Sequence, residues 1–131
     1  MFDRASLLKL VLILFGATFC LVYPLAVIWP SGWAWHAGAP YESDYFMMIV
    51  GVYATLGIFL ILASRDPGAN RSLILFTIWS SLVHAAIMAW QSFAMPEHFG
   101  HLYGDVPALV LVAVVLYVLL PATNKFAPAA A

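Results

Sequence analysis

The stretch from residue 72 to residue 94, SLILFTIWSSLVHAAIMAWQSFA, constrains the fold of this chain most. It contains no Asp, Glu, Lys or Arg. A helix of this length, at a rise of about 1.5 Å per residue, crosses a hydrocarbon layer of about 30 Å. The whole chain is 65% hydrophobic and 8% charged, whereas a soluble domain carries roughly 25% charged residues. These proportions indicate that lipid, rather than water, surrounds most of the molecule.

Other apolar stretches of the chain resemble this one. The sequence therefore predicts an all-α integral membrane protein with a single transmembrane domain over residues 1–131. The four transmembrane helices are expected at about residues 7–29, 45–64, 72–94 and 105–120. Short connections make neighbouring helices antiparallel, so the expected fold is a four-helix bundle of two antiparallel helical hairpins.

Two local signals refine this prediction. Pro24 lies inside the first apolar stretch, and a proline removes one helical hydrogen bond, so a kink is expected between Cys20 and Pro24. Gly51 and Thr55 are four residues apart on the second stretch, with Ala54 and Gly57 beside them. Small residues at such spacing let helix backbones approach closely, so this face is expected to pack on another helix of this chain or of a second copy.

The charged residues predict the orientation of the chain. Every Lys and Arg lies in the amino-terminal segment, in the connection between the second and third helices, or in the tail: Arg4, Lys9, Arg65, Arg71 and Lys125. With four crossings these segments share one side of the membrane, and the positive-inside rule makes both termini cytoplasmic. The net charge of −1 offers no basic surface, so nucleic acid is not an expected partner.

The first candidate site lies at membrane depth. Thr77, Ser81, His84 and Gln91 recur at helical spacing and share one face of the 72–94 helix, with His84 near its middle. Tyr53, on the neighbouring helix, is a possible partner for His84. Ionisable side chains inside membranes are biased toward function, so His84, Ser81, Tyr53 and Gln91 are candidate ligand-binding residues. The alternative is a purely structural hydrogen bond between helices.

The second candidate site lies in the loop before the fourth helix. Glu97, His98 and His101 combine carboxylate and imidazole groups, which suit zinc, copper or non-haem iron. They are candidate metal ligands on the outer rim. The alternative is that they mark the wet border of the membrane, while Asp105 caps the fourth helix.

The third candidate is an apolar ligand pocket lined by aromatic and Met side chains. The alternative for these residues is helix packing and lipid contact. They are Phe76, Trp79, Trp90, Phe93, Tyr103, Met47, Met48 and Met88.

No nucleotide-binding, hydrolase or metalloprotease motif is found in the sequence. Catalytic residues and cofactors therefore cannot be assigned, and a non-enzymatic role is favoured. The leading hypothesis is an accessory or structural subunit that acts through helix packing in a homo-oligomer or a larger membrane complex. One alternative is a binding or transport module for a small apolar or quinone-like molecule beside His84. A third hypothesis is a metal-binding protein with its site on the outer rim.

The segments YATLGIFLILASRDPGANRSLILFTIWSSLVHAAIMAWQSF, residues 53–93, and HLYGDVPALVLVAVVLYVLLP, residues 101–121, resemble the BphX-like group of small bacterial four-span membrane proteins. The resemblance implies a multi-pass protein of the bacterial inner membrane. It implies no activity and no catalytic residues.

Overall fold

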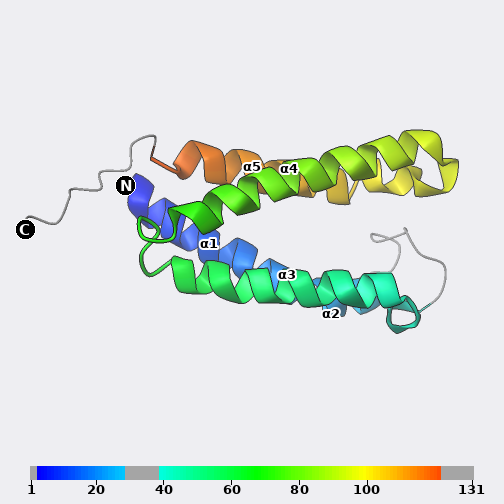
Figure 1. The fold of residues 1–131 in the computed structure, drawn as a ribbon, viewed down its shortest axis with the longest axis horizontal. Coiled ribbons are helices and arrows are strands. Elements are labelled where there is room, and N and C mark those ends of the chain that lie inside the picture. Colours follow the sequence, from blue (N-terminus) through cyan, green and yellow to red (C-terminus); the bar gives the residue numbers. More distant parts are fainter. Residues whose placement is uncertain (1–2, 29–38, 122–131) are drawn as a thin grey trace, which may run out of the picture.

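Helices make up all the regular secondary structure of residues 3–28 and 39–121, which are the residues that the computed structural model describes. Figure 1 shows them as long rods that run along one axis. In chain order the elements are α1 (Arg4–Cys20), α2 (Val22–Ile28), the 3-10 helix η2 (Pro40–Glu42), α3 (Asp44–Ala63), α4 (Arg71–Ala94), the 3-10 helix η3 (Pro96–Leu102) and α5 (Asp105–Leu119).

Three helical stretches are long and apolar enough to cross a membrane. They are Asp44–Ala63, Arg71–Ala94 and His98–Leu119. The bent pair of α1 and α2 makes a fourth if both belong to one broken span. The helices cover nearly the ranges expected from the sequence, except that the predicted end of the first span, Trp29, lies outside the described residues.

The first apolar stretch is broken where Pro24 predicts a kink. The axes of α1 and α2 differ by 58° across Leu21. Pro24 has no N–H with which to bond the Cys20 carbonyl, and its ring crowds that carbonyl, so α1 cannot continue. The expected kink is confirmed, and its consequence is that α2 leans toward the start of α3, where Val22 and Ala26 pack around Phe46.

The helices form two closely packed pairs, α1 with α3 and α4 with α5. Figure 1 shows the pair of α4 and α5 lying over the pair of α1 and α3. The helices α3 and α4 run in opposite directions, as their short connection predicts, but they contact each other little. The antiparallel partner of α3 is therefore α1, and the connection joins two pairs rather than closing one.

Two glycines explain why α1 and α3 pack so closely. A Cβ atom added to Gly57 would lie 2.5 Å from the carbonyl oxygen of Gly16, and one added to Gly16 would lie 2.6 Å from that of Gly57. The prediction of close packing on α3 is right for Gly57. A Cβ atom at Gly51 meets nothing within 4 Å inside this chain, so packing of Gly51 on a second copy stays a prediction. The partner glycine on α1 begins the small-residue stretch Gly16-Ala17-Thr18, with Cys20 one turn further on, but this stretch does not indicate which helix packs against it.

The main apolar core fills the end of the bundle that holds the start of α1 and the end of α5. Leu12, Leu60, Ile74 and Leu116 are fully buried there, one from each of the four long helices. Because all four helices contribute, this end holds the two pairs together.

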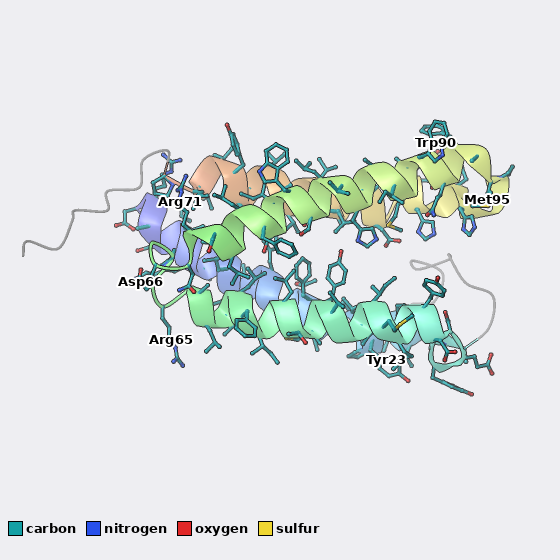
Figure 2. All side chains as sticks on the ribbon, in the orientation of Figure 1. Tyr23, Arg65, Asp66, Arg71, Trp90 and Met95 are labelled. Atoms are coloured by element: carbon teal, nitrogen blue, oxygen red, sulfur yellow. The ribbon has the colours of Figure 1, made fainter. Side chains whose placement is uncertain are left out.

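Two arginines close the same end of the bundle. Arg4 donates hydrogen bonds to the carbonyl groups of Val118, Leu119 and Leu120, and Arg71 donates one to the carbonyl of Pro121. Figure 2 shows Arg71 beside the end of α5. The last carbonyl groups of a helix lack partners within the helix and carry a partial negative charge, which cations stabilise.

Candidate functional site

A cavity of about 460 Å³ lies between the two helix pairs, at the end of the bundle away from the arginine-capped carbonyl groups. Its wall is mainly apolar, with contributions from the second half of α1, from α2 and α3 on one side and from α4, η3 and α5 on the other. The polar side chains in the wall are Thr18, Tyr53, His84, Gln91, His98, His101 and Asp105. Ligand sites commonly have this form, in which few polar groups stand in an apolar enclosure of some hundreds of Å³.

One polar pair in the wall joins the two helix pairs. The hydroxyl oxygen of Tyr53, on α3, lies 2.6 Å from Nδ1 of His84, on α4. The Phe19 ring packs against Tyr53 nearly perpendicular to it, at an interplanar angle of 87° and with the ring centroids 4.9 Å apart. Phe19 thus holds the phenol in place from α1, and the phenol in turn holds the imidazole of His84.

A second polar pair lies where η3 meets α5. Nδ1 of His101 lies 2.6 Å from a carboxylate oxygen of Asp105, and the two side chains are 6% and 10% exposed. The His98 ring stacks on His101 with the centroids 5.8 Å apart. The hydroxyl of Ser92 lies 2.8 Å from the carbonyl oxygen of His98, on η3, and 2.8 Å from that of Met88, on α4, so its hydrogen is shared between the two.

The geometry of Asp105 corrects the expectation that it caps the fourth helix. Gly104 is the N-cap of α5, and the Asp105 carboxylate accepts a hydrogen bond from His101 instead. The fourth span is also not limited to the short stretch that begins at Asp105. The 3-10 helix η3 extends it, so that the apolar helical stretch begins at His98.

The residues predicted to bind a ligand do not all face the cavity. His84, Tyr53 and Gln91 line it, whereas Ser81 is buried and lies outside its wall. The sequence pattern placed Ser81 and His84 on one broad face of α4, but only the part of that face nearer the carboxyl end of α4 meets the cavity. Their role in binding stays a prediction.

The predicted metal ligands are partly brought together. His98 and His101 both line the cavity, and the Glu97 side chain is outside the described part of the structure. Among the described residues, no group of three or more His, Cys, Asp or Glu side chains is placed to hold a metal ion. Metal binding therefore stays a prediction, with no geometric support from the described side chains.

Most of the aromatic side chains considered for a pocket face outward. Phe76, Trp79, Trp90, Phe93 and Tyr103 are all more than half exposed, and only Met88 of the predicted set lines the cavity. Figure 2 shows Trp90 pointing away from the facing helix pair. Phe15, Thr18 and Phe19 of the first helix were not predicted to line a site, because the pairing of α1 with α3 cannot be read from local spacing. Asp105 was considered as a helix cap and not as a site residue, although it follows His101 by one helical turn, and that spacing was a usable signal.

A model of a family of unknown function, DUF6632, matches residues 4–130. No curated protein matches the chain. No solved structure matches it either.

Proposed function

Because the chain belongs to DUF6632, a family of unknown function, we propose its function from the cavity itself. The protein is a small integral membrane protein that binds a small apolar molecule between its two helix pairs, with His84 as the main polar contact. The observation that carries this proposal is the cavity of about 460 Å³ that reaches His84.

The exposed surface supports a membrane location. Large apolar side chains are exposed on all five α-helices, among them Leu14, Ile28, Phe59, Trp79 and Tyr117. Soluble monomers rarely expose contiguous apolar patches of more than a few hundred Å². Lipid is the solvent that suits such a surface, and the resemblance to the BphX-like group favours the bacterial inner membrane.

The proposed topology has four crossings, with α1 and α2 together as one broken span and both termini in the cytoplasm. The start of α1, the connection between α3 and α4 and the end of α5 lie at one end of the bundle (Figure 1). Arg4, Arg65 and Arg71 belong to that end. Lys125, which contributed to the expected orientation, lies outside the described residues.

Cysteine labelling tests this topology. In a Cys20→Ala background, Ala39→Cys should react with an impermeant thiol reagent in intact cells, and Ala69→Cys should react only after the cells are broken. The reverse pattern would invert the orientation. Labelling of both cysteines from the same side would mean an even number of crossings between them, instead of the single crossing by α3, and would contradict the four-span arrangement.

Binding of fluorene, a rigid apolar tricyclic hydrocarbon, tests the cavity. We expect saturable binding of radiolabelled fluorene to the purified protein in detergent or nanodiscs. Ala108→Phe places a ring in the cavity wall and should weaken binding at least about tenfold, which corresponds to about 1.4 kcal/mol. The matched control is Val114→Phe on the same helix, because Val114 is exposed and lies outside the wall. Absence of saturable binding, or equal loss in both variants, would contradict the proposal.

The accessory-subunit hypothesis makes a different prediction for His84→Leu. If His84 only links α3 to α4, the substitution lowers the free energy of unfolding by about 0.6–2 kcal/mol, the range for interhelical polar contacts in membranes. Under that hypothesis 9-fluorenone, the ketone of fluorene, does not raise the melting temperature of the wild type or of His84→Leu. If His84 contacts a ligand, 9-fluorenone stabilises the wild type and stabilises His84→Leu less. Thermal unfolding with and without 9-fluorenone separates the two hypotheses.

A further inference from the structure

The Tyr53–His84 pair determines which hydrogen-bonding group of a ligand the cavity selects. We infer that His84 presents an N–H donor at Nε2, and that the cavity therefore selects an apolar molecule with a hydrogen-bond acceptor such as a ketone or quinone carbonyl. This inference rests on the proposed function and adds the chemical class of the ligand.

The direction of the Tyr53–His84 hydrogen bond is the first step. A phenol O–H is a more acidic donor than a neutral imidazole N–H, and an imidazole nitrogen is a stronger base than a phenol oxygen. The bond at 2.6 Å is therefore best made with Tyr53 donating and Nδ1 of His84 accepting. A neutral imidazole carries one hydrogen, so that hydrogen is then on Nε2.

The surroundings of Tyr53 support the same direction. Among the described residues, His84 is the partner found for the Tyr53 hydroxyl. If the hydroxyl accepted a hydrogen bond from Nδ1, its own hydrogen would lack an acceptor beside the Phe19 ring. The Nε2 lone pair of His84 would lack a donor as well. When Tyr53 donates, only the Nε2–H group of the pair is left without a described partner, so this arrangement satisfies more groups.

The position of His84 is the second step. His84 lines the cavity, and no described residue forms a hydrogen bond with its Nε2. The wall on α1 and α5 is mainly apolar, with Phe15, Leu109 and Val112, and its polar members there are Thr18 and Asp105, of which Asp105 is paired with His101. An acceptor on the ligand satisfies the Nε2–H group, whereas a donor on the ligand meets another donor. The tautomer that Tyr53 fixes thus distinguishes ligands of equal shape.

Three tricyclic probes of matched shape test this selectivity. Fluorene has no hydrogen-bonding group, 9-fluorenone has a carbonyl acceptor and carbazole has an N–H donor. After correction for partition of each probe into lipid, we expect 9-fluorenone to bind about twofold to tenfold more tightly than fluorene, the effect of one net hydrogen bond. Carbazole should bind no more tightly than fluorene. Saturable fluorene binding without preference for 9-fluorenone would overturn the inference and leave the proposed function intact. Absence of saturable binding by all three probes would overturn both.

Tyr53→Phe tests the part played by the tautomer. Without the phenol, the hydrogen of His84 can move to Nδ1, so that Nε2 can accept as well as donate. The ratio of the affinity for 9-fluorenone to the affinity for carbazole should therefore fall by at least about threefold. The matched control is Tyr23→Phe, because Tyr23 lies on the side of α2 and α3 that faces away from α4 (Figure 2). This substitution should leave the ratio of the two affinities unchanged. An unchanged preference in Tyr53→Phe would contradict the role of Tyr53.

The ring nitrogens of His84 give a readout that does not depend on binding. In protein labelled with ¹⁵N-histidine, the resonances that disappear in His84→Leu belong to this ring. We expect Nε2 to have the chemical shift of a protonated nitrogen and Nδ1 that of an unprotonated one. The opposite assignment would place the donor toward Tyr53 and overturn the inference, whatever the affinities of the probes.

Discussion

At the end of the bundle that holds Arg4 and Pro121, the four long helices meet around a filled apolar core, whereas toward the other end the two helix pairs leave a cavity between them. The filled end is built mainly from aliphatic side chains. Its buried hydroxyl groups, on Ser64 and Thr77, bond carbonyl groups of the preceding helical turn, and arginines cap α5. The hollow end holds the two hydrogen-bonded pairs, Tyr53 with His84 and His101 with Asp105.

The difference shows how a small membrane protein can combine a stable fold with an open site. In lipid, burial of apolar surface does not by itself drive helices together, so close packing and polar contacts decide stability. We expect the filled end to supply most of the free energy of folding. The hollow end can then expose polar groups to a ligand without loss of the fold.

The largest expected effect separates the core from the surface of one helix. Leu60→Ala removes a side chain that is 0% exposed and leaves a cavity, and we expect a loss of about 2–4 kcal/mol in the free energy of unfolding. In lipid this loss comes from the cavity and the missing packing contacts, and not from transfer of the side chain out of water. The control is Leu62→Ala, at a site that is 45% exposed, where the change should be small. Chemical unfolding in mixed micelles measures both. Similar losses at the two sites would mean that the filled end is not the stabilising core.

An intermediate effect is expected where α1 and α3 cross. Gly57→Ala forces the Gly16 backbone away, because the new Cβ atom would lie 2.5 Å from its carbonyl oxygen. Overpacking of this kind costs about 1–3 kcal/mol. The matched control is Gly51→Ala on the same helix, where a Cβ atom meets nothing within 4 Å. If both variants melt like the wild type, the close crossing does not contribute to stability.

Much of the fold could be predicted from the sequence because local signals set it. Apolar runs and the absence of charge determine where the helices lie, and Pro24 determines the break between α1 and α2. The contact of Gly16 with Gly57 could not be predicted, since it joins residues far apart in the chain and depends on which helices pair. The same holds for Arg4, whose partners at the end of α5 lie more than a hundred residues away.

The candidate site was predictable only in part, for a related reason. His84 could be identified because a polar group at membrane depth needs a partner, and Tyr53 was the natural partner on the next helix. The cavity itself depends on the distance between the two helix pairs, and this distance cannot be predicted from a residue pattern. Ser81 shares the helical face of His84 but lies outside the cavity wall, because periodicity assigns a residue to a face of the helix and not to the depth at which the helix pairs separate.

The smallest expected effect concerns the polar closure of the filled end. Arg4→Gln removes the guanidinium that bonds three terminal carbonyl groups of α5, and a cation at a helix carboxyl terminus typically contributes about 0.3–1 kcal/mol. Arg65→Gln is the control of equal charge change, because Arg65 is exposed and no described residue accepts a side-chain hydrogen bond from it. We expect a lower melting temperature for Arg4→Gln, with fluorene binding unchanged in both variants. If Arg4→Gln instead weakened fluorene binding while Arg65→Gln did not, the two ends would be coupled, and the filled end would control the cavity rather than merely support it.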